Sequence, residues 1–246
     1  MAKVAVRRIS ESSLLTGLLA YWKMDEISGS IVDLMNGLDM IGYNTPGSGQ
    51  GKLYPTAREF ARTSQQYFQI SGANSMSAMA GSFSVAWWEH PVSYTGVTGS
   101  YLAIVGTGGN PWYGGWHAIH THDGSIVWYL CDTTGSDHWW TEHTGRVPTL
   151  NAWNFSVLTY DASTGAITYR LNALPEQTYT WSTGSLKGVT NLAACLPSIG
   201  KDPNPTTIVH CYDGLIGPVM LWTRPLTPAE RLDLYNGGAG LAYPFN

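Results

Sequence analysis

Three histidines lie close together near the middle of the chain and have side chains that could bind a metal ion. They are His117, His120 and His122, and Asp123 directly follows the last of them. Side chains alternate between the two faces of a strand, so His120 and His122 would share one face and His117 would point to the other. A metal site would need a third ligand from a neighbouring strand. The alternative is that these histidines use their ring nitrogens for hydrogen bonds within a sheet. We adopt that alternative and expect no metal and no cofactor.

Two Gly-rich segments carry aromatic side chains of the kind that stack on sugar rings. Trp112 and Tyr113 lie in the first segment, and Trp139 and Trp140 lie in the second. Exposed aromatic residues in loops are frequently functional. The same rings could instead contact a neighbouring subunit or pack internally. These four residues are therefore candidates for glycan binding or for subunit contact.

Short runs with the composition of β-strands recur along the chain, each bounded by turn-forming residues. The runs are 18–24, 82–89, 101–105, 116–121, 125–130, 154–160, 166–172 and 217–223. Asp123-Gly124 predicts a tight hairpin turn, and the segment 161–165 predicts a longer one with Gly165 at positive φ. The sequence therefore predicts an all-β fold, a two-sheet antiparallel jelly-roll sandwich with one short C-terminal helical turn.

The run 82–89 has a regular alternation of side chains. Phe83, Val85 and Trp87 share one face, which we expect to enter the core between the sheets. Trp88 lies on the other face, between small residues. We therefore expect Trp88 to form an open, flat platform and include it among the candidate binding residues.

One helix near the end of the chain is strongly indicated. Thr227-Pro-Ala-Glu230 has the pattern of a capping box with proline at the first helical position. Gly237-Gly238 follows seven residues after Glu230 and would end the helix.

Composition excludes several classes of protein. The chain has 246 residues, a net charge of −4, and 12% each of charged and aromatic residues. A disordered tail or a coiled coil would carry more charge, and only 13 Lys and Arg residues argue against nucleic-acid binding.

The first apolar stretch, 14–22, is too short to span a membrane and lacks a signal-peptide cleavage pattern. The three cysteines, Cys131, Cys195 and Cys211, cannot all pair within the chain, which fits synthesis in a reducing cytosol.

The first 13 residues differ from the rest and are predicted to form an arm, with a single domain over 14–246. The arm contains Val4 and Val6, followed by the basic pair Arg7 and Arg8. Val4-Ala-Val6 could add as a strand to the sheet edge of a neighbouring chain. The alternative is an arm that folds back over its own sandwich.

Five segments carry a family resemblance, namely 17–37, 57–70, 82–88, 153–161 and 212–235. The most specific segment contains Tyr212-Asp-Gly-Leu-Ile-Gly-Pro-Val-Met-Leu-Trp222 and then Leu226-Thr-Pro-Ala-Glu230. It resembles the last strand and closing helical turn of the laminin G-like, pentraxin-related branch of the concanavalin A-like lectin/glucanase superfamily. The resemblance implies a jelly roll of two antiparallel sheets. It implies little about function, because the fold hosts lectins, glycanases and adhesion modules.

The resemblance does not extend to the catalytic residues of the superfamily. Its glucanases place their carboxylates at alternate positions of one strand, as Glu-x-Asp-x-Glu, and this motif does not occur here. Glu89 is a single carboxylate at a core-facing position. Gly217 stands where the family often has an acidic residue, so a calcium site is not implied. We therefore expect a protein that is not an enzyme.

These features favour a non-enzymatic surface or structural protein of a virion, as a capsid decoration or a tail module. Its expected partners are other virion proteins or copies of itself, with cell-surface or environmental glycans as candidate ligands. Nucleic acid and membranes are not expected partners. A bacteriophage virion protein fits this description, since it is assembled in the host cytoplasm and needs no signal peptide. Two alternatives remain open, a bacterial carbohydrate-binding or adhesion module and a glycan-cleaving enzyme with an unrecognised site.

Overall fold

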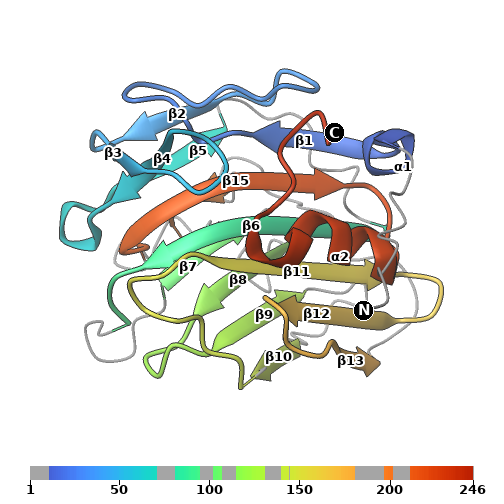
Figure 1. Ribbon diagram of the computed structural model, residues 1–246. Coiled ribbons are helices and arrows are strands. Elements are labelled where there is room, and N and C mark those ends of the chain that lie inside the picture. Colours follow the sequence, from blue (N-terminus) through green and yellow to red (C-terminus); the bar gives the residue numbers. More distant parts are fainter. Residues whose placement is uncertain are drawn as a thin grey trace, which may run out of the picture.

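Two antiparallel β-sheets stacked face to face make up the protein, as the computed structural model shows (Figure 1). The structure describes residues 11–70, 81–94, 102–106, 115–130, 140–143, 145–180, 197–201 and 211–245. Within these ranges, no helix is both long enough and apolar enough to cross a membrane. The predicted all-β sandwich with one short C-terminal helix is confirmed.

Over the described residues, sheet A has eight strands, seven of them in the order β13-β12-β11-β6-β15-β4-β3, while β1 also pairs with β15. Their bounds are β1 Leu18–Trp22, β3 Gly47–Gln50, β4 Thr56–Phe60, β6 Phe83–Pro91, β11 Asn154–Asp161, β12 Ala166–Leu171, β13 Gln177–Thr180 and β15 Gly214–Trp222. Strands β6 and β15 are the longest and lie side by side in the middle of the sheet. Their register shifts between Ile216 and Val219, so β15 carries a bulge there.

In the part of the chain that the structure describes, sheet B has seven strands in the order β10-β9-β8-β7-β14-β5-β2, so β10 and β2 are the outermost of these strands. The bounds are β2 Met40–Tyr43, β5 Tyr67–Ile70, β7 Leu102–Gly106, β8 Trp116–His120, β9 Ile126–Leu130, β10 Trp140–His143 and β14 Ser198–Ile199. The helices are α1 Glu11–Leu15 and α2 Pro228–Tyr235, and the short 3-10 turns are η1 Arg62–Ser64 and η3 Asn236–Gly238.

Aromatic side chains fill the core between the sheets. Phe83, Val85 and Trp87 of β6 all point into it, as the alternation predicts. Phe83 stacks on Trp116 of sheet B with ring centroids 4.9 Å apart, and Trp87 meets Trp128 edge to face at 5.5 Å. Contacts of this kind add to the free energy of burying the rings, so they hold the two sheets together.

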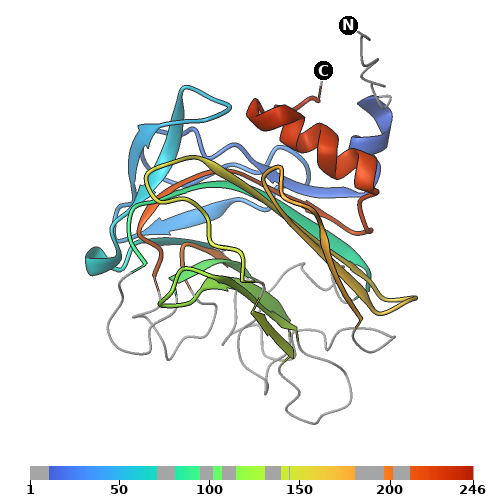
Figure 2. The same ribbon diagram turned by 60° about the horizontal axis from the view of Figure 1, so that its bottom comes forward.

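Trp88 lies on the outer face of sheet A, but it is not an open platform. Helix α2 covers this face (Figure 2). Tyr235 of α2 stacks near the Trp88 indole with ring centroids 6.3 Å apart, and Phe155 packs at 5.3 Å. Lys52 Nζ lies 5.3 Å from the ring centroid. Only 1% of Trp88 is exposed, so the prediction of a platform is wrong: the predicted helix itself occupies that space.

Helix α2 begins as the sequence predicts and ends at Tyr235, shortly before the predicted stop at Gly237-Gly238. The Thr227 side chain accepts a hydrogen bond from the Glu230 N–H, the Glu230 carboxylate bonds back to the Thr227 N–H, and Pro228 opens the helix. Asn236 in the left-handed conformation ends it. Arg224 forms a bidentate ion pair with Glu230, with Nη–Oε distances of 2.7 and 2.9 Å. This pair ties the start of the helix to the segment that follows β15.

All eight predicted strands are present, with ends within three residues of the prediction. Both hairpin turns are also confirmed, with Gly124 and Gly165 at φ of 83° and 69°. The unpredicted elements are short, and the strand Gly47–Gln50 has the sequence GSGQ, with no apolar residue. An alternating apolar pattern cannot reveal such a strand.

The arm predicted over residues 1–13 meets the domain at helix α1, which spans the expected boundary. Leu14 is buried, and its carbonyl accepts a hydrogen bond of 2.7 Å from Trp222 Nε1. Arg224 donates to the Ser13 carbonyl at 2.5 Å. The arm residues singled out above, Val4, Val6, Arg7 and Arg8, lie outside the described residues.

Candidate functional site

Two stacked tyrosines lie on the outer face of sheet B, at its β2 edge. Tyr43 of β2 and Tyr67 of β5 are paired in register. Their ring centroids are 4.7 Å apart and their planes differ by 7°. Lys201, just after β14, places Nζ 4.5 Å from the Tyr67 ring centroid. We call Tyr43, Tyr67 and Lys201 the tyrosine stack.

The order of the strands decides which ring of the tyrosine stack is available to a ligand. Strand β5 lies between β14 and β2, so the Tyr67 ring lies between Lys201 and Tyr43. Among the described strands, β2 is one of the two outermost strands of sheet B, and 39% of Tyr43 is exposed. One face of the Tyr43 ring is therefore covered by Tyr67, and part of the residue stays exposed to solvent.

Hydrogen bonds between two turns fix the position of Tyr43. Asn44 Nδ2 donates to the Gln65 carbonyl at 2.8 Å, and Gln66 Nε2 donates to the Thr45 carbonyl at 2.9 Å. These bonds join the turn after β2 to the turn before β5. A ring held by such a support loses little conformational entropy when a ligand stacks on it.

The Tyr67 hydroxyl stays protonated at neutral pH. Burial raises the pKa of Tyr67 above its ordinary value of 10, and the nearby Tyr43 and Cys211 raise it further. The hydroxyl is then able to donate and to accept hydrogen bonds. Aromatic faces next to polar groups of this kind suit a ligand that has both C–H faces and hydroxyl groups.

A second polar arrangement lies inside the sandwich. Glu89 of β6 and His120 of β8 are both fully buried, and Oε2 lies 2.7 Å from Nε2. The carboxylate also accepts hydrogen bonds from the Tyr212 hydroxyl at 3.2 Å and from Trp87 Nε1 at 3.1 Å. On the other side of the imidazole, Nδ1 lies 3.0 Å from the Gly124 carbonyl. A carbonyl only accepts, so Nδ1 carries a proton and a second proton lies between Nε2 and Oε2.

This buried pair links the two sheets and does not present a carboxylate to solvent. Burial and the neighbouring Glu89 raise the pKa of Tyr212 well above 10, so its hydroxyl remains a donor. Glu89 therefore has a partner on each carboxylate oxygen. The core-facing position predicted for Glu89 is confirmed.

The structure separates the three histidines that the sequence places together. His117 is buried on the opposite face of β8 from His120, in agreement with the predicted alternation. His122 is exposed, and the prediction that it shares a face with His120 is wrong, because the strand ends at His120 and a turn follows. Asp123 accepts hydrogen bonds inside that turn. Across the described ranges, no three His, Cys, Asp or Glu side chains gather closely enough to hold a metal ion.

The predicted aromatic loops contribute little to the described structure. Trp112, Tyr113 and Trp139 lie outside the described residues. Trp140 begins β10, where its backbone pairs with Leu130 of β9. Their roles as ligand or subunit contacts stay predictions.

Gly217, which replaces the acidic residue of the resembled family, has a structural explanation. A Cβ at this position would lie 3.2 Å from Trp153 Cζ3 and from Trp88 Cβ. The glycine lies in the bulge of β15, opposite β6. A larger residue would displace these rings, so the position holds packed aromatic residues where the family often holds a carboxylate.

The tyrosine stack is not among the site residues predicted from the sequence. The alternation in Tyr67-Phe-Gln-Ile70 places Phe68 inward and Tyr67 outward, and Met40-Ile-Gly-Tyr43 places Tyr43 outward in the same way. An outward tyrosine on each of two short strands was therefore a visible signal. Their pairing was not visible, because 23 residues separate the strands and the register is set by the fold.

Comparison with known proteins supports this description of the fold. Residues 62–230 match the family model described as "Concanavalin A-like lectin/glucanases superfamily". No curated protein matches the chain in sequence. Domain 4 of AbnA, a GH43 extracellular arabinanase from Geobacillus stearothermophilus solved with arabinotriose, is similar with a TM-score of 0.57 and 15% identity, over 88% of this chain and 97% of that one.

Two further solved structures have the same fold. The Ruminococcus gnavus IT-sialidase CBM40 bound to α2,3 sialyllactose gives a TM-score of 0.52 and 14% identity, over 63% of this chain and 82% of that one. The binding domain of Botulinum neurotoxin DC, in complex with rat synaptotagmin II, gives 0.60 and 11%, over 91% and 52%. At these identities the likeness concerns the fold alone. Together with the two-sheet architecture, the family match shows that the chain belongs to the concanavalin A-like lectin/glucanase superfamily.

Proposed function

We propose that this protein is a non-enzymatic, lectin-like module that binds a saccharide on the exposed side of Tyr43. The observation that carries the proposal is the tyrosine stack, which fixes a half-exposed aromatic ring at the outermost strand of sheet B. Saccharides present apolar C–H faces that pack on such rings, and they present hydroxyls to polar neighbours. Relatives in fold that were solved with arabinotriose and with sialyllactose are compatible with this class of ligand.

We also propose that the protein has no glycan-cleaving activity. A retaining glycanase needs a second carboxylate about 5 Å from the first, with substrate between them. Glu89 is buried and its oxygens are hydrogen-bonded to His120, Tyr212 and Trp87. This arrangement supports a structural role for Glu89.

We assign the module to the surface of a virion, as a decoration or tail component. The low charge, the odd number of cysteines and the basic arm over residues 1–13 support this assignment. Mass spectrometry of purified particles from the source would test it. Recovery of the chain in stoichiometric amounts with structural proteins is expected, and its absence from particles would overturn the assignment.

A glycan array tests the binding function. The full chain is expected to bind a restricted set of glycans, with arabinotriose and sialyllactose included as probes. Tyr43→Ala should lose the signal, whereas Leu174→Ala, which alters an exposed residue far from β2 in the sequence, should keep it. Release of reducing sugar from the bound glycans would contradict the proposal that the protein is not an enzyme. An array on which no glycan binds would contradict the proposed binding function.

A further inference from the structure

We propose that the loop between β1 and β2 is the docking surface for residues 1–10 of a second copy of this chain. The inference names a partner for the assembly role proposed above. It is independent of glycan binding, because the tyrosine stack takes no part in it. Three observations carry it, namely the exposed apolar side chains of the loop, its acidic charge, and the opposite composition of residues 1–10.

The loop exposes an unusual number of apolar side chains for its length. Ile27 is 73% exposed and Val32 is 49% exposed, and Leu34 also faces solvent. Val32 and Leu34 are two residues apart on a segment that pairs with both sheets. Ile31 bridges to Met40 at the edge of sheet B, and Asp33 bridges to Trp22 at the edge of sheet A. The segment thus closes one side of the sandwich and turns its alternate side chains outward.

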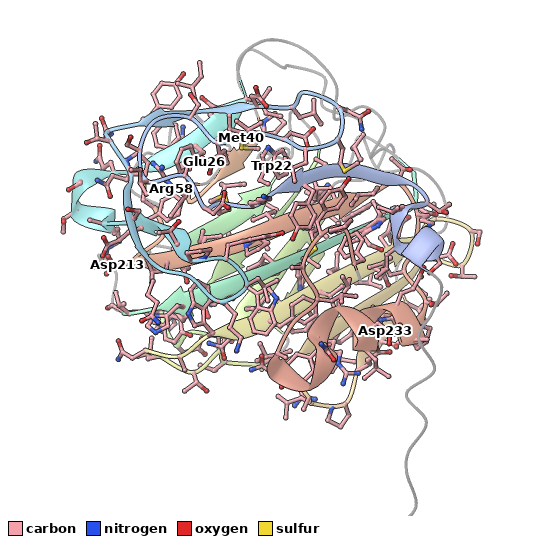
Figure 3. The ribbon with its side chains drawn as sticks, turned by 45° about the horizontal axis from the view of Figure 1, so that its top comes forward. Trp22, Glu26, Met40, Arg58, Asp213 and Asp233 are labelled. Carbon is pink, nitrogen blue, oxygen red and sulfur yellow. The ribbon has the colours of Figure 1, made fainter. Side chains whose placement is uncertain are left out.

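The same loop carries four carboxylates and one lysine. Lys23 is the lysine, and the carboxylates belong to Asp25, Glu26, Asp33 and Asp39. Asp33 and Glu26 Oε2 are buried, and Asp25 lies 4.0 Å from Lys23 Nζ, so Asp25 and Asp39 carry the acidic charge that the loop exposes. We call Asp25, Ile27, Val32, Leu34 and Asp39 the acidic edge. Figure 3 shows Glu26 on this loop, at the opposite end of the molecule from helix α1, with the buried Arg58 beneath it.

The acidic edge is rigid before any partner binds. The buried Asp33 carboxylate accepts hydrogen bonds from four backbone N–H groups, those of Tyr21, Met35, Asn36 and Leu38. Glu26 Oε1 accepts from the Val32 N–H at 2.8 Å, and Asp39 Oδ1 accepts from the Asp33 N–H at 2.9 Å. A preformed surface lowers the entropy lost on association.

Residues 1–10 have the chemistry that complements this surface. Their sequence, MAKVAVRRIS, contains three basic residues and no acidic residue. Val4, Val6 and Ile9 supply apolar side chains next to the basic pair Arg7-Arg8. Apolar contact with Val32 and Leu34, together with attraction between opposite charges, would give both affinity and register.

Chain geometry favours a second copy as the donor of the arm. Arg8 lies three residues before Glu11, and three extended residues span at most about 11 Å. Helix α1 lies at the Leu18 end of β1 (Figure 1). Asp25 lies three residues beyond the other end of β1, a strand that is itself roughly 13 Å long at about 3.3 Å per residue. The basic pair therefore reaches the acidic edge of a neighbour more readily than that of its own copy.

The test combines peptide binding with the mass of the full chain. The acceptor is the full-length Arg7→Glu/Arg8→Glu variant, whose own arm is repelled by the acidic edge. A fluorescent peptide with the sequence of residues 1–10 is expected to bind it saturably, and the affinity should fall as salt rises. Acceptors that also carry Asp25→Lys or Val32→Ser should bind at least tenfold more weakly. Glu59→Lys, an exposed acidic residue of β4, is the matched control and should leave binding unchanged.

Native mass spectrometry then separates the two arrangements of the arm. The wild-type chain is expected to form oligomers that Arg7→Glu/Arg8→Glu dissociates, and thermal unfolding of each variant checks that it is folded. Saturable peptide binding by the acceptor, combined with a wild-type chain that stays monomeric, would overturn the exchange between copies, because the arm would then dock on its own chain. Absence of peptide binding by folded acceptors would overturn the docking surface itself. Neither result depends on whether a glycan binds at Tyr43.

Discussion

His120 Nε2 lies 2.7 Å from Glu89 Oε2, and this contact crosses the interior from sheet B to sheet A. Both side chains are fully buried among aromatic rings. The other ring contact described between β6 and β8, that of Phe83 with Trp116, is apolar, so the Glu89–His120 pair is a polar contact that fixes how these two strands face each other. Breaking one side of such a pair leaves a buried group without its partner.

Replacing one member of the pair is therefore expected to destabilise the fold strongly. His120→Ala should lower the free energy of unfolding by about 3–5 kcal/mol, because Glu89 would remain buried without its main partner. Denaturant unfolding measures this loss. His122→Ala, which removes an exposed imidazole two residues away, is the control and should change stability by less than about 0.5 kcal/mol. Equal effects of the two variants would contradict the structural role of the pair.

The start of helix α2 is expected to make stability depend on acid pH. Burial alone would raise the pKa of Glu230, but Arg224 and the Thr227 N–H hold it down to about 2, from an ordinary value of 4.5. Folding therefore favours the ionised carboxylate, and this contribution is complete above about pH 4.5 and is lost as the pH falls towards 2. The difference in unfolding free energy between wild type and Glu230→Gln should shrink across that window. A difference that stays constant from pH 6 to pH 3 would show that Glu230 is not coupled in this way.

Trp88 is expected to contribute to stability and not to ligand binding. Trp88→Ala would leave a cavity beneath Tyr235 and Phe155, with an expected loss of about 3–5 kcal/mol. Chemical denaturation measures the loss, and Trp88→Phe should recover part of it. If Trp88 were an exposed platform, Trp88→Ala would change the unfolding free energy by less than about 1 kcal/mol. That result would contradict the burial of Trp88 beneath α2.

Restoring the acidic residue of the family at Gly217 is expected to harm the fold. The Gly217→Asp side chain would press on Trp153 and Trp88, and it would place a charge against aromatic rings. We expect a loss of roughly 2 kcal/mol or more, with a smaller loss for Gly217→Ala. Thermal unfolding with and without calcium is the measurement. Stabilisation of Gly217→Asp by calcium would contradict the structural explanation of the glycine.

Much of the fold was accessible from the sequence because its strands follow the alternating pattern closely. The alternation in the run 82–89 correctly predicts which side chains point into the core, and the capping box at Thr227 correctly predicts where α2 begins. The same reasoning failed for Trp88, because an alternation identifies two faces but not what covers the second one. The cover comes from α2, about 140 residues later in the chain.

The candidate site was harder to predict because it depends on pairing between distant strands. Tyr43 and Tyr67 are unremarkable as single outward tyrosines, and only the β2–β5 register stacks them. The prediction that His120 and His122 share one face of a strand was wrong for a related reason. Their separation depends on where β8 ends, and strand ends are set by turn geometry more than by composition.

The central claim, that a saccharide binds on Tyr43, is tested most directly by titration calorimetry with the strongest ligand from the glycan array. The wild-type chain and Tyr43→Phe, which keeps the ring, should bind with similar affinity. Tyr43→Ala should bind at least tenfold more weakly, about 1.4 kcal/mol, while unfolding at a similar temperature. Unchanged affinity of a folded Tyr43→Ala variant would contradict the account.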